Sequence, residues 1–152
     1  MFDLLALADQ CAPTVARQTI VALVTHESKQ NPFAVGVNGG TRISRQPQNQ
    51  NEAINIAEKL ISMGVSIDIG LAQINSGNLK KLGLTVGQAF DPCTNLHAAE
   101  QVLHWCYDPA AKLFGSGQPA LQAALSCYNT GDYGRGLRNG YVAGVYKIAK
   151  RQ

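Results

Sequence analysis

The stretch "VALVTHESKQNP", residues 21–32, places a glutamate at the end of an apolar helical stripe. Residues three and four apart share one face of a helix, so Glu27 lies on the same face as Leu23 and Val24. The preceding turns carry further apolar residues on this face. The pattern predicts a helix over residues 14–28 whose core-facing side ends in an acid. A carboxylate there costs free energy unless it is paired or keeps its proton.

Two interpretations of Glu27 follow from this position. In the first, burial disfavours the charged carboxylate and the negative end of the helix repels it, so its pKa rises and a general acid is available near neutral pH. In the second, the side chain turns out to solvent or pairs with Lys29 or Arg42, and it is an ordinary helix-end glutamate. The stripe alone leaves both interpretations open.

The rest of the chain predicts a mainly helical domain with a small sheet. Residues 33–44, "FAVGVNGGTRIS", predict a β-hairpin in which Ile43 returns alongside Val35 and Val37. Residues 65–70, "VSIDIG", predict a third short strand. Apolar residues at helical spacing predict further helices at residues 1–10, 53–63, 95–106, 119–128 and 142–148. Asn95 is the expected N-cap of the third of these. We therefore expect one α+β domain, residues 1–152.

Composition excludes several classes of protein. The chain is 45% hydrophobic and 15% charged, which supplies enough apolar material for a folded core. The net charge of +3 gives no argument for nucleic-acid binding, and the basic residues of 133–152 suit either a solvated helix or contact with an anionic partner. No apolar run reaches transmembrane length. The first ten residues lack a basic segment and a cleavage site, so an exported protein has lost its signal or leaves by another route.

Four cysteines without metal-binding spacing predict two disulfides in an oxidising compartment, with free thiols in a cytosolic protein as the alternative. Four cysteines allow three connectivities, and the sequence leaves all three open. We favour Cys11–Cys106 with Cys93–Cys127, because the first bridge would tie the helix that bears Glu27 to the main helical body.

The histidines do not predict a metal site. His26 begins an H-E-x-x-H zinc motif, but the position of its second histidine holds Gln30. His97 and His104 share a helical face opposite to the apolar one, and that face is expected to be solvated. We expect neither a metal nor another cofactor.

The second candidate stretch is "DIGLAQIN", residues 68–75. Gly70 lets backbone approach a ligand closely, and Gln73 and Asn75 offer amides that suit sugar hydroxyls and acetamido groups. Asp68 faces away from the core if its apolar neighbours face inward, and it is the nearby second acid. The plainer alternative for these residues is an exposed loop.

The third candidate stretch is "SCYNTG", residues 126–131. Tyr128 offers a ring with a hydroxyl, and Asn129 offers another amide, although an asparagine there is also a common helix cap. Together with Glu27 and the second stretch, they predict a cleft with one acid of raised pKa and walls of amides and a tyrosine. That combination suits the cleavage of a glycan.

Three motifs, "THESKQNP", "GLAQIN" and "CYNTG", resemble in order and separation those of the lysozyme-like lytic transglycosylases. The flanking segments "CAPTV", "FAVGVNGG", "SRQP", "DPCTNL" and "NGYV" resemble more closely the VirB1-type members, which accompany type IV secretion systems. The resemblance covers residues 10–147. It implies a lysozyme-like fold, mainly helical with a small three-stranded antiparallel sheet.

The resemblance also implies roles for the candidate residues. Glu27 is the sole catalytic acid and then the base, and Ser28 orients it. The remaining residues expected to bind substrate are Gly70, Gln73, Asn75, Tyr128 and Asn129. The chain departs from the family's pattern at Ala72, Cys127 and Thr130, which concerns the detail of the subsites.

The implied reaction is non-hydrolytic cleavage of the β-1,4 bond between N-acetylmuramic acid and N-acetylglucosamine in peptidoglycan. Glu27 protonates the glycosidic oxygen and then takes the proton of the sugar's own C6 hydroxyl, which closes a 1,6-anhydro ring. Attack within one sugar has a large advantage over attack by water. The implied setting is the periplasm, where the enzyme opens the wall for a type IV secretion or conjugation apparatus, whose components and the glycan strands are its partners.

Two alternatives remain. A hydrolytic muramidase would use a water molecule, with Asp68 as the candidate for a second carboxylate. A non-catalytic glycan-binding assembly module is the other, and Glu27 disfavours it because a binder needs no acid at the end of a core stripe.

Overall fold

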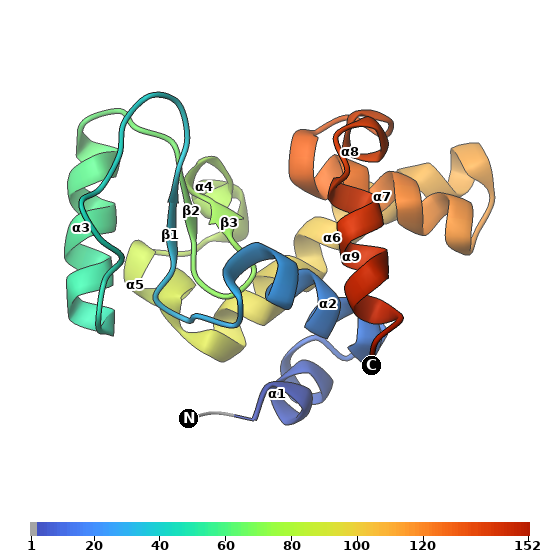
Figure 1. Ribbon diagram of the computed structural model, residues 1–152, viewed down its shortest axis with the longest axis horizontal. Coiled ribbons are helices and arrows are strands. Elements are labelled where there is room, and N and C mark those ends of the chain that lie inside the picture. Colours follow the sequence, from blue (N-terminus) through green and yellow to red (C-terminus); the bar gives the residue numbers. More distant parts are fainter. Residues whose placement is uncertain (1–2) are drawn as a thin grey trace.

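The computed structural model describes residues 3–152, so Met1 and Phe2 of the first predicted helix lie outside the described residues. The elements form two groups (Figure 1). A small sheet lies with α3 (Gln50–Ser62), α4 (Leu79–Leu82) and α5 (Val86–Phe90). The other group holds α1 (Leu4–Cys11), α2 (Arg17–Ser28), α7 (Gln118–Thr130), α8 (Arg135–Arg138) and α9 (Tyr141–Ala149), and α6 (Pro92–Phe114) runs through both. The α+β class is confirmed.

Helix α2 carries the predicted apolar stripe. Ile20, Leu23 and Val24 are fully buried, and the helix packs against α1 and α9. It begins at Arg17, three residues later than predicted, because the chain turns at residues 13–15. Burial of the stripe fixes the rotation of the helix, and this rotation sets the direction in which Glu27, in its last turn, points.

The sheet has the order β1-β2-β3 and is antiparallel throughout, with strands β1 (Val35–Val37), β2 (Ile67–Ile69) and β3 (Ile74–Asn75). The predicted hairpin is wrong, because Ile43 lies outside any strand and β1 pairs with β2 instead. The third strand is β3, which turns directly into a 3₁₀ helix over Ser76–Asn78. The expected number of strands is therefore right, but the third strand is β3 and not the segment at Ile43, and the pairing of the strands differs accordingly.

A glutamine side chain takes the place of the expected hairpin partner. The amide of Gln46 accepts from the backbone N–H of Val35 at 2.9 Å and donates to the carbonyl of the same residue at 3.0 Å. These two groups are the ones a returning strand would bond. The outer backbone groups of Val35 are thus satisfied without a strand at Ile43, which the alternation pattern could not reveal.

Helix α6 begins earlier than the N-cap prediction placed it. Asp91 caps the helix by accepting from the N–H of Thr94 at 3.0 Å, and Pro92 occupies the first turn, where its missing N–H costs nothing. Asn95 is instead inside the helix and fully buried. Its amide donates to the carbonyls of Ile69 and Ala89 at 2.9 and 2.8 Å, and its oxygen accepts from an N–H in the loop after β2.

Two disulfides are present, as predicted, but the favoured pairing is wrong. The bridges are Cys11–Cys93 and Cys106–Cys127. Cys93 and Cys106 lie at separate points on α6, roughly 20 Å apart along its axis. The end of α1 packs beside the start of α6, and α7 returns along its later half, so each cysteine of α6 meets the nearer partner.

Candidate active site

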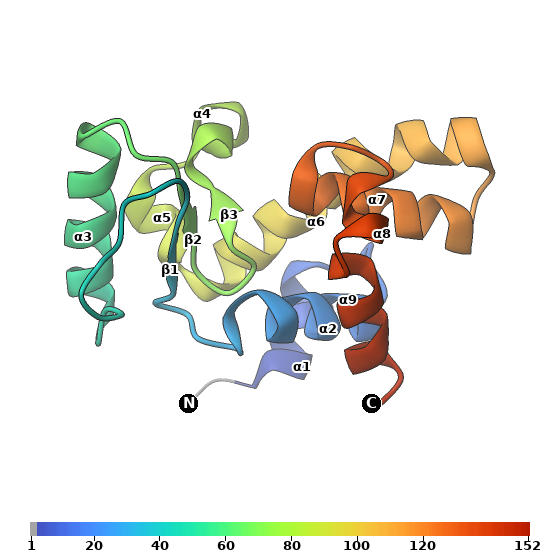
Figure 2. The same cartoon turned by 45° about the horizontal axis from the view of Figure 1, so that its top comes forward.

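A cleft of about 300 Å³ lies between the sheet and the helical group. Its lining residues come from β2 and β3 and from α7, which lie beside one another in Figure 2. Its lining is mainly polar and combines residues from all three candidate stretches with others: Glu27, Asn38, Asp68, Gln73, Ile74, Asn75, Asn78, Val102, Tyr128 and Asn129. The fold therefore brings together segments that are far apart in the sequence.

Glu27 is half-buried in the cleft, at the end of α2. Burial of its carboxyl group raises its pKa from 4.5 to about 7; the nearby charge of Asp68 adds to the rise, and a hydrogen bond from Tyr141 opposes it. Within residues 3–152 no ion pair involves Glu27, so the alternative pairing with Lys29 or Arg42 does not occur. The carboxyl group is thus an acid that holds its proton to near neutral pH.

Tyr141 contacts the acid directly, and sequence reasoning did not single it out. Its hydroxyl donates to Oε2 of Glu27 at 2.6 Å. The tyrosine is the first residue of α9, and its ring packs edge-on against His26 with the ring centroids 4.9 Å apart. The contact joins residues 114 positions apart. Its only trace in the sequence is the flanking segment "NGYV", which names no partner for the hydroxyl.

Asp68 faces away from the core, as the alternation predicted, because Ile67 and Ile69 on either side are fully buried, and the structure places it in the cleft lining. The amide of Asn75 donates to one of its oxygens at 2.9 Å, and the amide of Asn38 donates to the other at 3.3 Å. Burial raises the pKa of Asp68, and these two hydrogen bonds oppose the rise. The cleft therefore holds a second carboxyl group, on the wall formed by the sheet.

The amides of this wall are held by the backbone around them. Gln73 has a positive φ of 54°, and its amide nitrogen donates to the carbonyls of Gly70 at 3.1 Å and Ala34 at 3.3 Å. A side chain at Gly36 would collide with the oxygen of Gln73. These contacts fix the rotamer of Gln73, and together with the bond from Asn75 to the second carboxyl they give the wall a preset pattern of polar groups.

The opposite wall comes from the end of α7. The Tyr128 ring lines the cleft, but its hydroxyl donates to the backbone carbonyl of Ala72 at 2.7 Å, and burial raises the pKa of this phenol well above its usual value. Asn129 is exposed, and its oxygen accepts from the amide of Asn139 at 3.0 Å. The tyrosine hydroxyl thus bonds the backbone across the cleft, and the asparagine presents its amide to solvent.

Two of the expected substrate-binding residues lie outside the cleft lining. The hydroxyl of Ser28 donates to the carbonyl of Val24 in its own helix at 3.2 Å and does not contact the carboxyl of Glu27. Gly70 is buried, has a φ of +75°, and a side chain there would collide with the amide of Asn95. The absence of a side chain at Gly70 therefore makes room for the buried amide of Asn95, and not for a ligand as was expected.

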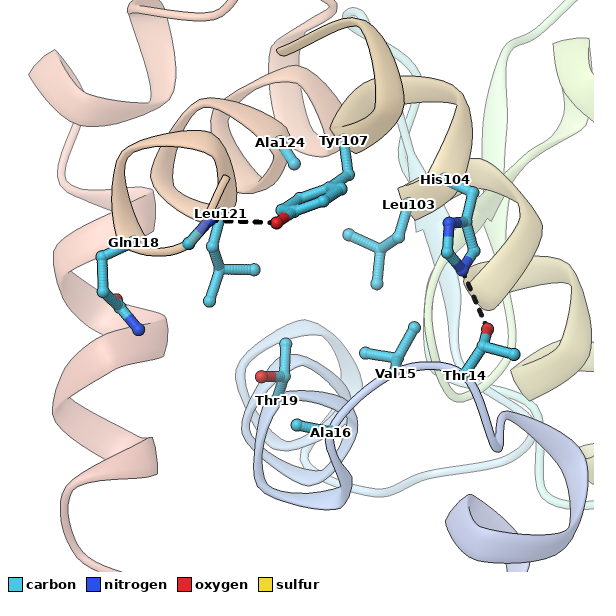
Figure 3. Close-up of a pocket in the computed structure, with 11 residues that line it drawn as sticks. Thr14, Val15, Ala16, Thr19, Leu103, His104, Tyr107, Gln118, Leu121 and Ala124 are labelled. Carbon is cyan, nitrogen blue, oxygen red and sulfur yellow. Dashed lines mark hydrogen bonds between the residues drawn. The ribbon is translucent and has the colours of Figure 1, made fainter. Parts of the chain in front are cut away.

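A second cavity, of about 330 Å³, lies between the start of α2 and the facing sides of α6 and α7 (Figure 3). Leu103 and Leu121 point into it, and no described residue of its lining is acidic. Its polar groups bond one another: the Tyr107 hydroxyl accepts from a backbone N–H at 3.1 Å, and His104 bonds the Thr14 hydroxyl at 2.8 Å. Of the two cavities, the first is therefore the one whose lining offers a carboxyl group for acid catalysis.

The two histidines of α6 bond nearby side chains. His97 lies 3.4 Å from the carboxylate of Glu100, and His104 contacts Asp108 at 3.3 Å in addition to its bond with a threonine. Over residues 3–152, no three residues among the histidines, cysteines, aspartates and glutamates gather as a metal site would require.

Residues 5–143 match the transglycosylase SLT domain. The chain belongs to this family. The match runs through every segment that lines the cleft, and it confirms the resemblance drawn from the three motifs, together with the lysozyme-like fold that this resemblance implied. Within the described part of the chain, each helix is too short or too polar to cross a membrane.

Relatives of this SLT-domain chain carry names from type IV secretion. The type IV secretion system protein virB1 of Brucella suis is 48% identical over 139 residues, which cover 91% of this chain and 58% of that protein. The protein virB1 of Agrobacterium fabrum is 39% identical over 144 residues, which cover 95% of this chain and 58% of that protein. The chain thus spans under two thirds of the length of these relatives. No solved structure matches it significantly.

Proposed function

We propose that the chain is a single lysozyme-like domain, residues 1–152, that cleaves peptidoglycan glycan strands without consuming water. One observation carries the proposal: the half-buried carboxyl group of Glu27, with a pKa of about 7, lies in a cleft whose walls are amide side chains. An acid with a pKa near the working pH can both give and take a proton. Amides suit a substrate rich in hydroxyl and acetamido groups.

The first step breaks the glycosidic bond. Protonated Glu27 donates its proton to the glycosidic oxygen, the bond from this oxygen to the anomeric carbon breaks, and the leaving sugar departs with a new hydroxyl. The other sugar is left with positive charge at its anomeric carbon, which its own N-acetyl oxygen can stabilise. The hydroxyl of Tyr141, 2.6 Å from Oε2, holds the carboxyl group in position and stabilises the carboxylate that this step creates.

The second step closes the ring. The carboxylate of Glu27 takes the proton of the C6 hydroxyl, and the C6 oxygen forms a bond to the anomeric carbon of the same sugar. The product is a 1,6-anhydro end, the acid is restored, and no water enters the balance. A single carboxyl group suffices because the nucleophile is part of the substrate and is already close to the anomeric carbon.

The remaining cleft residues position the glycan. The fixed amides of Gln73 and Asn75 and the ring of Tyr128 line the cleft beside the acid, and Asn129 offers an exposed amide at its rim. In this proposal Gly70 and Ser28 act indirectly, since they support the loop and the helix on which the cleft residues sit. No cofactor is required by either step.

A hydrolytic muramidase is the second candidate, and the position of Asp68 in the same cleft favours it. A second carboxylate could activate a water molecule or stabilise the charged sugar, as paired carboxylates do in glycosidases. The asparagines that hold Asp68 orient its oxygens, and they are equally consistent with a role in shaping the wall of a transglycosylase.

The biological setting is inferred from the relatives. The Brucella suis protein is named a type IV secretion system protein, so we propose that this chain acts on the wall in the periplasm for a type IV secretion or conjugation apparatus. Glycan strands would be its substrate, and components of that apparatus would be its protein partners. The disulfides Cys11–Cys93 and Cys106–Cys127 suit an oxidising compartment of this kind.

The test is mass spectrometry of purified peptidoglycan after digestion. Anhydro-ended fragments, each one water lighter than the hydrolytic product, are expected from the wild type, and Glu27→Gln is expected to release none. Reducing ends in their place would establish the muramidase, and Asp68→Asn should then abolish activity, whereas a transglycosylase should continue to form anhydro ends with Asp68→Asn. Binding of peptidoglycan without any release would show a glycan-binding module.

A further inference from the structure

The chain's single tryptophan lies one helical turn beyond the cleft. Val102 of α6 lines the cleft, and Trp105 follows three residues later on the same helix. Residues three apart share a face, and the rise between them is about 4.5 Å. Trp105 is half-buried, so part of its indole surface is open to solvent.

A lysine of α4 reaches the same tryptophan. Asn78 lines the cleft and precedes α4, and Lys81 follows it three residues later. The Nζ atom of Lys81 lies 3.8 Å from the centroid of the Trp105 ring. Each member of this pair is one turn beyond a residue of the cleft lining, so we infer that the pair lies beside the cleft, between α4 and α6.

The segment that supplies Lys81 differs in charge from the catalytic part of the cleft. Residues 76–90 contain Lys80 and Lys81 and no acid. The part of the cleft around Glu27 holds two carboxyl groups, the second being Asp68. A polymer that lies along the cleft therefore meets acids at the point of cleavage and, beside the cleft, a cation next to an aromatic ring.

We propose that Trp105 and Lys81 form an outer subsite for a peptide-bearing sugar of the glycan strand. The part of the indole that Lys81 leaves uncovered packs against the apolar face of the pyranose ring, and the ammonium of Lys81 attracts a carboxylate of the stem peptide carried by N-acetylmuramic acid. This proposal rests on the proposed function, because it takes peptidoglycan as the substrate. Its consequence is a preference for strands that keep their peptides over strands from which the peptides have been removed.

Since Trp105 is the only tryptophan, its fluorescence reports binding at this subsite without interference from another indole. The probe is a defined peptidoglycan tetrasaccharide with its stem peptides, and the matched ligand is the same tetrasaccharide after an amidase has removed them. Both are titrated into the Glu27→Gln protein, in which the strand stays intact. We expect the emission to change with both ligands and the dissociation constant to be lower for the peptide-bearing one.

Two lysine variants of the Glu27→Gln protein distinguish a specific effect of the Lys81 charge from a general effect of positive charge on α4. Lys81→Gln is expected to raise the dissociation constant for the peptide-bearing ligand roughly two- to fivefold, the range for a partly exposed ion pair, and to leave the peptide-free ligand nearly unchanged. Lys80→Gln is the matched control, because it removes the same charge from the neighbouring position of α4, and it should leave both constants near those of the parent. Melting temperatures of the two variants check that the fold is kept.

Three results would overturn the subsite. One is saturable binding of the peptide-bearing ligand, measured by calorimetry, without any change in tryptophan emission. Another is equal affinity for the two ligands. The third is an equal loss of affinity in Lys80→Gln and Lys81→Gln, which would indicate only a general attraction to positive charge. Failure of the proposed function is separate, since it would appear as wild-type protein that releases no anhydro-ended fragments.

Discussion

Glu27→Gln is expected to stabilise the protein at alkaline pH while it abolishes cleavage. The pKa of this acid is about 7 in the folded protein, against an ordinary value of 4.5. Below pH 4.5 the carboxyl group is protonated in both the folded and the unfolded chain. Between these values the folded chain holds a proton that the unfolded chain has lost, so stability falls as pH rises, and above pH 7 the full loss is present.

The size of the effect follows from the difference between the two pKa values. Each unit corresponds to about 1.4 kcal/mol, so ionisation of Glu27 lowers the free energy of unfolding by about 3 kcal/mol at most. The neutral amide of glutamine escapes this loss and can still accept the hydrogen bond from Tyr141. For a domain of this size, the gain corresponds to roughly 6–12 °C in melting temperature. The rate of cleavage should fall by about 10²–10⁴ or more, because one residue performs both proton transfers.

Urea unfolding of the wild type and the variant at pH 4, 6 and 8 measures this difference. The variant should match the wild type at pH 4 and exceed it progressively at pH 6 and 8. Glu58→Gln is the matched control, because it makes the same change at an exposed glutamate of α3, outside the cleft. A difference between wild type and Glu27→Gln that is constant across the three pH values would refute the inference that burial raises the pKa of the acid.

Three further predictions concern single contacts. Tyr141→Phe should move the alkaline limb of the pH–rate profile to higher pH, because the hydrogen bond that it removes lowers the pKa of the acid; an unmoved limb would contradict this. Tyr128→Phe should lower stability by about 1–2 kcal/mol in urea unfolding and largely spare the rate, because its hydroxyl satisfies the carbonyl of Ala72. Cys106→Ser with Cys127→Ser should lower stability by about 3 kcal/mol, the chain-entropy value for a loop that spans 21 residues, and peptide mapping of the wild type should recover this bridge.

Local patterns predicted what depends on neighbours in the sequence. The stripe that ends at Glu27 predicted the helix and the face on which the glutamate lies, because burial of a helical face repeats every three or four residues. The alternation around Asp68 predicted that its side chain points away from the core, because successive side chains of a strand point to opposite faces. The chemistry of the motif residues and the family they resemble indicated Gln73, Asn75, Tyr128 and Asn129, and all four line the cleft. Ser28 and Gly70 were indicated in the same way and lie outside its lining.

Contacts between distant residues could not be predicted in this way. Gln46 satisfies the edge of β1 with its side chain, and nothing in its sequence neighbourhood marks it as a substitute for a strand. The pairing of Cys11 with Cys93 depends on where α1 packs along α6. The number and spacing of the cysteines do not reveal this position. Tyr141 is hidden for the same reason, since its partner lies at the other end of the chain.

The peptide group of Ala72 has a consequence for how the enzyme meets its substrate. Its N–H donates to the oxygen of Asn95 on α6 at 2.8 Å, and its carbonyl accepts from the hydroxyl of Tyr128 on α7 at 2.7 Å. The loop after β2 is therefore bonded at a single residue to α6, which runs through both groups, and to α7 of the helical group. Such a joint resists hinge bending, so we expect the cleft to keep its width when a strand enters. The sugar ring, which is more flexible than the cleft, would then undergo most of the distortion needed to reach the transition state.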